Sequence, residues 1–420
     1  MSRSTPASAP PGAPGFADRP NVALIIACGC LVAMIGFGPR SALGLFLAPM
    51  TEARDWSREI FSLALAIQNL MWGAGQPVAG MIADRYGTAR TIAIGALVYT
   101  AGLVMMAQVE SPGLLYLSAG VMIGLGVAFC SFSLVLAAFG RSVTPAKRSL
   151  AFGIGTAAGS FGQFLFAPLG QGLIDGFGWQ QALYILAALT MLVPFLGIAL
   201  RGRSVHVPGA PGSGADQSLR QAMAEAFGTR GFVLLTFGFF VCGFHVAFIT
   251  VHLPPYIVDL GLDASWGAIA IALIGFCNVF GALASGYIGG RFSKPWLLSA
   301  IYLGRAIAIA VFLMVPATPF TVLTFAGVMG FLWLSTVPPT SGLIAVMFGP
   351  RYMATLFGFV FFSHQIGAFL GVWLGGRLYD QTGSYDMIWY MGIALGLFAA
   401  IVHLPIREAP VERLLAGPAE

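Results

Sequence analysis

Charged residues are scarce in this chain of 420 residues. Asp, Glu, Lys and Arg together make up 9% of the sequence, whereas an average soluble domain carries about 25%. So few charges cannot cover the surface of a water-soluble fold of this length. The shortage therefore excludes a soluble enzyme, a nucleic-acid-binding protein and a peripheral membrane protein.

Motifs for nucleotide, disulfide and catalytic chemistry are also missing from the sequence. Its glycine-rich stretches contain no GxxxxGK(S/T) phosphate-binding motif, which excludes transport driven by ATP. The five cysteines all fall inside apolar runs, and their odd number argues against a disulfide framework. Because no catalytic triad or cluster of metal ligands is visible, we expect neither enzymatic activity nor a cofactor.

Hydrophobic residues are what the sequence has in abundance, at 58% of the chain. A spanning helix needs about 20 residues, so the apolar content is enough for about twelve spans. We predict an all-α membrane protein with twelve transmembrane helices. The expected spans lie near residues 22–50, 58–82, 91–109, 113–138, 149–173, 179–200, 231–257, 265–290, 295–315, 319–346, 352–378 and 386–405.

The predicted spans fall into two groups of six. Residues 1–20 are rich in Pro, Ala, Ser and Gly, and we expect them to be disordered. A loop at 201–230 separates a six-helix bundle at 21–200 from a second bundle at 231–406, and a tail follows at 407–420.

Basic residues are distributed unequally between the two sides of the expected spans. Sixteen of the 21 lie on the side of the N-terminus, and only Arg54, Arg58 and Arg377 lie on the other. The positive-inside rule then predicts that both termini are cytoplasmic, and we expect a bacterial inner membrane. The sixteen are Arg3, Arg19, Arg85, Arg90, Arg141, Lys147, Arg148, Arg201, Arg203, Arg220, Arg230, Arg291, Lys294, Arg351, Arg407 and Arg413.

The two halves of the chain resemble each other at an offset of 205 residues. Eleven identities occur at this one offset, in the first and fifth spans of each half. Such parallel six-helix repeats are typical of transporters that bind substrate between the repeats. The first members of the pairs are Gly38, Ala42, Pro49, Phe152, Gly153, Gly162, Phe164, Gly170, Leu173, Asp175 and Gly178.

A charged glycine motif follows the second span, in the sequence GMIADRYGTAR at 80–90, and a weaker copy, GYIGGRFSK, follows the eighth at 286–294. We interpret these loops as a cytoplasmic gate, in which a glycine lets helices approach and an aspartate accepts hydrogen bonds from helix N-termini. The alternative is a charged loop that only anchors the topology. The gate residues are Gly80, Asp84, Arg85, Gly87, Arg90, Gly286, Arg291 and Lys294.

The first motif resembles the GxxxD(R/K)xGxx(R/K) signature of the major facilitator superfamily (MFS). Within this superfamily the chain is similar over nearly its full length to bacterial relatives of the monocarboxylate porters, as seen in residues 348–380 and in a long first span that ends at Ala48-Pro49-Met50. The resemblance implies the MFS fold, two pseudo-symmetric six-helix bundles that work by alternating access. Where animal monocarboxylate porters carry an Asp and an Arg in the eighth span, this chain has Asn278 and Ala282.

Five ionisable residues lie inside predicted spans and away from the span ends, whereas every Asp and Glu falls in a loop or near a span end. A membrane interior with cationic and titratable groups but no carboxylate favours an anionic substrate. We therefore predict a secondary transporter for a small, monocarboxylate-like organic anion that moves with a proton. Alternatives are an efflux carrier for neutral or amphipathic compounds and a non-transporting membrane sensor. The five are Arg40, His245, His252, Arg305 and His364.

Each of these residues has two interpretations. Arg40 can hold a carboxylate through two hydrogen bonds, or it can be a packing residue bonded to carbonyls of its kinked helix. His245 and His364 are candidates for anion binding and proton coupling, with a hydrogen-bonded packing histidine as the alternative. The offset of 205 residues places His245 in the seventh span at the position equivalent to Arg40. We expect Arg305 to bond neighbouring carbonyls, with substrate contact as the alternative, and His252 to reach toward the outer surface.

Uncharged polar residues complete the predicted substrate site. They can bind substrate or serve as hydrogen-bonding contacts between helices. We expect a small-molecule substrate, a proton and the lipid bilayer as partners, no nucleic acid, and a functional monomer. The residues are Gln68, Asn69, Gln163, Asn278 and Gln365.

Overall fold

The computed structural model describes the whole chain except residues 1–20, 131, 144–147, 203–217, 350–351 and 416–420. The predicted disorder at 1–20, half of the central loop and the end of the tail therefore lie outside the described residues. The described part is helical. The elements are α1 (Val22–Ala42), η2 (Leu43–Phe46), α2 (Leu47–Arg54), α3 (Arg58–Tyr86), α4 (Thr88–Ala107), α5 (Pro112–Leu115), η3 (Tyr116–Met122), α6 (Ile123–Phe129), α7 (Phe132–Ser142), α8 (Arg148–Thr190), α9 (Val193–Gly197), η5 (Ile198–Leu200), α10 (Leu219–Gly228), α11 (Arg230–Asp259), α12 (Ala264–Gly289), α13 (Lys294–Met314), α14 (Pro319–Leu332), α15 (Val337–Phe348), α16 (Met353–Thr382), α17 (Asp386–His403) and α18 (Glu412–Leu415).

Ten helical stretches in the described residues are long and apolar enough to cross a membrane. One of them, Gly153–Leu200, has 48 residues, about twice the length that a crossing needs. It turns at Gly178, whose φ of +80° is a backbone conformation that favours glycine. The predicted spans 149–173 and 179–200 are therefore joined without a loop. The expected all-α membrane architecture is confirmed.

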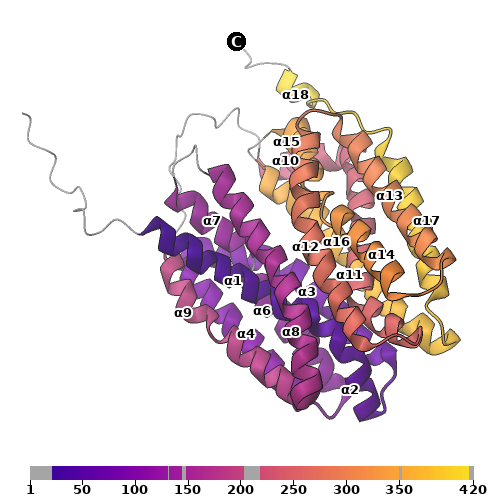
Figure 1. Cartoon of the computed structure of the whole chain (residues 1–420). Helices are drawn as coiled ribbons and strands as arrows, with labels where there is room; N and C mark the ends of the chain where they lie inside the picture. The colour runs from indigo at the N-terminus through magenta and orange to yellow at the C-terminus, as the bar shows by residue number, and fades with distance from the viewer. Residues whose placement is uncertain (1–20, 131, 144–147, 203–217, 350–351, 416–420) are drawn as a thin grey trace, which may run out of the picture.

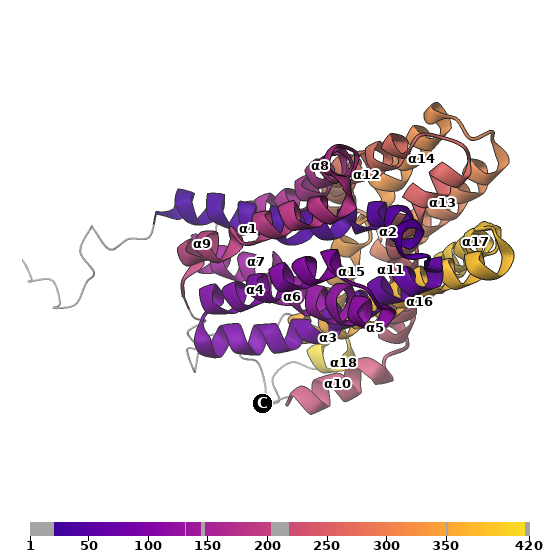
Figure 2. The ribbon, with the colours of Figure 1, turned by 90° about the horizontal axis from the view of Figure 1, so that it is seen from below.

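The helices form two sets that lie side by side. The first set, from α1 to η5, is drawn in indigo to magenta, and the second set, from α10 to α18, runs from pink to yellow (Figure 1). Figure 2 shows where the sets meet, with α3 beside α16 and α8 beside α12. Two helix pairs thus carry most of the contact between the sets.

Glycines at repeat-related positions pack the same pair of helices in each set. A Cβ on Gly162 of α8 would lie 2.5 Å from the carbonyl oxygen of Met34 in α1. Its repeat partner Gly367 of α16 would meet the carbonyl oxygen of Phe240 in α11 at 2.0 Å. Helix backbones approach this closely only where the side chain is absent.

The two ends of the molecule differ in charge, and we name them from their residues. The basic end carries Arg85, Arg90, Arg201, Arg291 and Lys294, at the adjoining ends of α3, α4, η5, α12 and α13. The opposite end, here the Arg58 end, is where α2 meets α3, α11 meets α12 and α16 meets α17.

Contact between α3 and α16 is close at the Arg58 end and is lost toward the basic end. A Cβ on Gly376 would meet Ser62 Oγ at 2.4 Å, and one on Gly73 would meet Gln365 Cβ at 2.9 Å. Nearer the basic end, a Cβ on Gly80 or Gly358 would have nothing within 4 Å. The two helices therefore touch from one end to the middle and then diverge.

The α8 and α12 pair shows the same pattern. A Cβ on Gly275 of α12 would meet the backbone nitrogen of Phe164 at 2.9 Å. Closer to the basic end, a Cβ on Gly153 of α8 would have nothing within 4 Å. The sets are thus in contact from the Arg58 end to the middle of the helices, and Gly80, Gly153 and Gly358 nearer the basic end have open space around them.

Replacing Gly367 by alanine is expected to destabilise the protein by about 1–3 kcal/mol, because the new Cβ would overlap the carbonyl of Phe240 and push α16 from α11. Gly358→Ala, in the same helix, has open space around its Cβ and should be neutral or stabilising by up to about 1 kcal/mol. Thermal unfolding of the two purified variants in detergent measures the difference. Equal unfolding temperatures would contradict the close α11–α16 contact.

Candidate functional site

Arg40 projects from α1 toward α3 of the same set. Its helix contains Pro39, and the Ser41 hydroxyl donates to the carbonyl of Gly38, 2.6 Å away. The guanidinium donates from Nη2 to Asn69 Oδ1 on α3 and lies over the ring of Trp72, 4.6 Å from its centroid. Arg40 is thus held by one amide and by the aromatic faces of Trp72 and Phe37, and it stays partly exposed.

Helix α16 of the second set completes this site. The Gln365 amide donates to the backbone carbonyl of Asn69 at 3.1 Å. Phe361 packs edge-on against Trp72, with 5.5 Å between ring centroids. The structure therefore brings together three predicted residues, Arg40, Asn69 and Gln365, and adds two aromatic rings. We call these five residues the Arg40 cluster.

His364 lies beside the Arg40 cluster. Its Nδ1 is 3.0 Å from the side-chain oxygen of Gln365, and because that oxygen can only accept, Nδ1 donates the hydrogen. The imidazole stacks on Phe361 at 5.6 Å with an interplanar angle of 9°. Of the predicted histidines, this one is in contact with the cluster.

His245 points away from the cluster. Its Nε2 lies 2.7 Å from the carbonyl oxygen of Gly392 in α17, and a Cβ on Gly396 would meet its ring at 3.4 Å. The side chain is 1% exposed and fills the contact between α11 and α17 inside the second set. The 205-residue offset makes His245 equivalent in sequence to Arg40, but the two side chains have different surroundings: His245 contacts α17, whereas Arg40 contacts α3.

The remaining predicted polar residues bond elsewhere. Gln163 of α8 donates to the carbonyl of Ile271 in α12 at 3.5 Å, so it joins the two sets. Asn278 donates to Ser160 Oγ at 3.1 Å and makes a second bond between the same helices. Gln68 donates to the carbonyl of Ala119 at 2.8 Å, within the first set.

Arg305 and His252 are both fully buried. Arg305 donates to the carbonyl of Leu332 at 2.8 Å and to that of Trp333, where the chain leaves helical geometry between α14 and α15. These are the carbonyl bonds expected of it. The expectation that His252 reaches toward the surface is wrong, because its Nε2 bonds the carbonyl of Val372 at 2.8 Å in the interior.

The predicted gate residues lie at the basic end and do not bond one another among the described contacts. Gly87, with φ of +96°, forms the turn between α3 and α4. Arg85 and Arg291 lie over the neighbouring Tyr86 and Tyr287 rings, 5.3 and 4.0 Å from the centroids. The structure does not describe the side chain of Asp84. The others are placed as follows: Lys294 bonds Glu408, Arg90 and Gly286 are exposed, and Gly80 has open space beside it.

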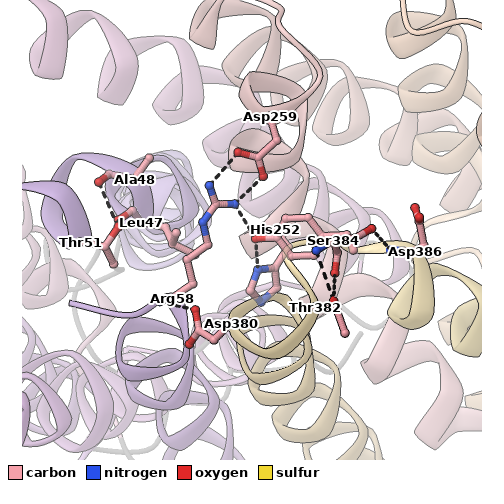
Figure 3. A network of polar contacts seen from close by, with 11 residues as sticks. Leu47, Ala48, Thr51, Arg58, His252, Asp259, Asp380, Thr382, Ser384 and Asp386 are labelled. Atoms are coloured by element: carbon pink, nitrogen blue, oxygen red, sulfur yellow. Dashed lines mark hydrogen bonds and ion pairs between the residues drawn. The ribbon is translucent and has the colours of Figure 1, made fainter. Parts of the chain in front are cut away.

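Sequence reasoning missed a charged contact between the sets at the Arg58 end. Arg58, at the start of α3, pairs with Asp259 at the end of α11 through two hydrogen bonds of 2.7 Å (Figure 3). Asp380 of α16 accepts from the backbone nitrogens of Arg58 and Glu59 at 3.0 and 2.7 Å. A carboxylate of the second set therefore caps a helix of the first, where the helix dipole favours negative charge.

A second charge pair extends this contact. Glu59 accepts from Trp373 Nε1 at 3.1 Å and from Arg377 at 3.3 Å, both on α16. We name the five charged residues Arg58, Glu59, Asp259, Arg377 and Asp380 the Arg58 latch. Two features of the sequence pointed to these residues. Arg58 and Arg377 are two of the three basic residues on that side of the expected spans, and Asp380 is the repeat partner of Asp175.

His252 connects the latch to the interior of the second set. Arg58 donates to the Tyr385 hydroxyl at 3.0 Å, and that hydroxyl lies 3.0 Å from His252 Nδ1. Because a carbonyl can only accept, His252 donates from Nε2 to Val372, and its Nδ1 is free to accept from Tyr385. The latch is thus backed by a buried chain of donors and acceptors (Figure 3).

Comparison with known proteins identifies the family. The model of the Major Facilitator Superfamily matches residues 29–372. An uncharacterised MFS-type transporter of Bacillus subtilis, YcxA, is 25% identical over 390 residues, covering 88% of this chain and 91% of the relative. Monocarboxylate transporter 11 of Mus musculus is 26% identical over 421 residues, covering 96% and 90%.

Solved structures agree on the fold. A bacterial homolog of the human lysosomal transporter Spinster, in an inward-facing and unoccupied conformation, superimposes with a TM-score of 0.72 at 17% identity, covering 93% of this chain and 96% of that one. A D-xylose-proton symporter gives 0.73 at 13% identity, covering 93% and 100%. The chain therefore belongs to the Major Facilitator Superfamily, as a multi-pass membrane transporter that is related to the monocarboxylate transporters and is not an enzyme.

Proposed function

We propose that the protein carries a small organic monocarboxylate together with a proton, by alternating access between its two sets of helices. The observation that carries this proposal is Arg40, a cation at the contact between the sets. Among the described side chains, the buried polar residues include no Asp or Glu. A cationic site without a neighbouring acid favours an anion over a cationic or neutral substrate.

Arg40 has hydrogen-bonding capacity left for a substrate. Asn69 takes one Nη2 hydrogen, and Nε has no partner among the described residues. A guanidinium carries five donors in a planar fork that matches a carboxylate. Each hydrogen bond between the guanidinium and a carboxylate is expected to contribute about 1.5–3 kcal/mol. Because the cluster contains a single cation, it suits a substrate with one carboxylate group.

The aromatic residues around Arg40 favour a substrate with an apolar body. Phe37 and Trp72 lie 5.8 and 4.6 Å from its guanidinium carbon, and Phe361 packs on Trp72 from the second set. These rings offer apolar faces beside a single cation. We therefore infer a monocarboxylate with an apolar or aromatic body, in preference to a dicarboxylate or a highly hydroxylated acid.

We assign the coupling proton to His364 and not to His245. His364 bonds Gln365, and Gln365 bonds the residue that holds Arg40. A proton on His364 would add positive charge beside a bound anion, and its release would remove that charge. His245 lacks such a connection, since it bonds Gly392 in α17.

Alternating access gives roles to the two ends. The Arg58 latch closes one end of the site, and the predicted gate residues would close the other when the sets rock. We propose that the basic end is cytoplasmic, with both termini there, in a bacterial inner membrane. The conformation described is then open to the cytoplasm, and its closure would bury Gly80 and Gly358. A monomer is sufficient for this motion.

With the protein in liposomes and an inward proton gradient, we expect accumulation of benzoate or hexanoate and little of succinate. Arg40→Gln should raise the apparent KM at least tenfold, about 1.4 kcal/mol of lost binding. Arg40→Lys should rescue only part, because an ammonium lacks the planar fork. Radiolabelled uptake measures each constant.

A matched control for this experiment is Arg220→Gln, an exposed arginine of α10. It should leave the apparent KM unchanged. Carboxylate uptake that is absent in every condition, or an unchanged KM in folded Arg40→Gln protein, would refute the anion site.

His364→Gln is expected to retain exchange of labelled for unlabelled substrate while losing stimulation by the proton gradient. Glutamine keeps a hydrogen-bond donor beside Gln365 but cannot carry a proton at neutral pH. His245→Gln serves as the comparison and should retain gradient stimulation. Counterflow and gradient-driven uptake, measured on the same proteoliposomes, separate the two steps. If only the His245→Gln protein loses stimulation by the gradient, the coupling proton is to be assigned to His245 and not to His364.

Arg58→Gln is expected to shift the protein toward a conformation closed at the basic end. The Arg58 and Asp259 side chains are 17% and 26% exposed, so we assign about 1 kcal/mol to their pair, a population change of about fivefold. Spin labels at positions 153 and 358, in a background without the native cysteines, should show a larger population of short distances.

Two further variants test the latch assignment. Exchange of the charges, Arg58→Asp with Asp259→Arg, should restore part of the wild-type distribution. Arg54→Gln removes a neighbouring arginine whose guanidinium lies 5.7 Å from Trp179 within the first set, and it should leave the distances unchanged. If all three variants give the same distances, the latch does not control the conformation.

A further inference from the structure

A hollow at the basic end is separate from the Arg40 cluster. It has a volume of about 530 Å³ and lies between the α3–α4 turn and the α9–η5 segment, all in the first set. It therefore does not lie on the path between the two sets. Its lining includes Tyr86, Arg90, Ala93, Pro194, Ile198 and Arg201.

We propose that this hollow binds the phosphate headgroup of an anionic phospholipid. Arg90 and Arg201 supply two exposed guanidinium groups on opposite walls. No described carboxylate lies within ion-pair distance of either arginine. Two cations that line one hollow and pair with no described carboxylate attract a group with at least one negative charge.

The start of α4 adds to this attraction. The helix has 20 residues, its N-cap Gly87 provides no side-chain hydrogen bond, and its first turn contains no acidic residue. Among the side chains of its own N-cap and first turn, none therefore compensates the positive end of this helix dipole at the hollow. The backbone nitrogen of Thr88 bonds the carbonyl of Gly202 at 3.1 Å, which ties the α4 end to the α9–η5 wall.

The apolar part of the hollow decides between a lipid and a soluble phosphate. Ala93, Pro194 and Ile198 line it beside the arginines. Phe195 and Ile94, which follow the lining residues Pro194 and Ala93 in the chain, are 66% and 49% exposed, as suits side chains in contact with acyl chains. Tyr86, also exposed, is of the type that gathers at the membrane interface. A soluble anion would make no use of this surface.

The proposal is tested on the delipidated full-length protein by native mass spectrometry with added phosphatidylglycerol or phosphatidylcholine. We expect the anionic lipid to be retained at least tenfold more strongly. Arg201→Gln should reduce its affinity about fivefold, since each basic residue near the membrane surface contributes an increment of that size. Arg201→Lys should retain most of the affinity and guards against a folding defect.

The matched control is Arg407→Gln, an exposed arginine after α17 in the second set. It should leave retention of phosphatidylglycerol unchanged. Inorganic phosphate at millimolar concentration should fail to displace the lipid, and efficient displacement would identify a soluble-anion site instead. Equal retention of both lipids, or equal losses in the Arg201→Gln and Arg407→Gln proteins, would overturn the proposal.

Discussion

A charge within the bilayer core is costly unless the protein pairs it, hydrogen-bonds it or gives it access to water. The two interior arginines meet this constraint in different ways. Arg305 is fully buried and donates to carbonyls that the break between α14 and α15 leaves outside helical bonding. Arg40 has one amide partner, two aromatic faces and a partly exposed surface at the contact between the sets. Each guanidinium keeps one nitrogen without a partner among the described residues, so the two arginines differ in exposure: Arg305 is fully buried, whereas Arg40 stays partly exposed, and that difference supports Arg40 as the proposed substrate residue.

Helix contact makes the placing of Arg40 possible. Gly73, about one helical turn from Asn69, allows α3 and α16 to approach closely. Gln365 of the second set can therefore donate to the backbone carbonyl of Asn69, whose side chain accepts from Arg40. The same two helices are joined at their Arg58 end by Asp380, which caps α3. Because packed helices move as rigid bodies and not by continuous deformation, contact over half their length and divergence over the other half describe one position of a rocking motion.

Hydropathy and the repeat were sufficient to predict the membrane fold, because both can be recognised in the sequence without knowing which side chains meet in space. The repeat extends to backbone geometry, since Gly178 and its partner Gly383 both adopt positive φ. Side-chain partners were harder to predict. Arg58 and Asp259 are about 200 positions apart, and only the packing of α3 against the second set brings them together. His245 was paired with Arg40 by register, yet rotation of a side chain about its helix axis is not encoded in register, and it faces α17. His252 looked like a residue near a helix end, but Val372 and Tyr385 provide interior partners that no sequence distance indicates.

The Arg40 cluster and the Arg58 latch both include residues of α3 and α16, and in the proposed mechanism this arrangement lets substrate binding act on the latch. A carboxylate that bonds Arg40 competes with Asn69 for guanidinium donors, and Asn69 is bonded to Gln365 across the contact. Because α3 and α16 move as rigid bodies, a change in that contact would also move Arg58 on α3 and Asp380 on α16. A ligand shifts a conformational equilibrium only by the difference in its affinity for the two states. In the proposed mechanism this difference would arise because residues of both sets contribute to the Arg40 cluster, so rocking of the sets would alter the site itself.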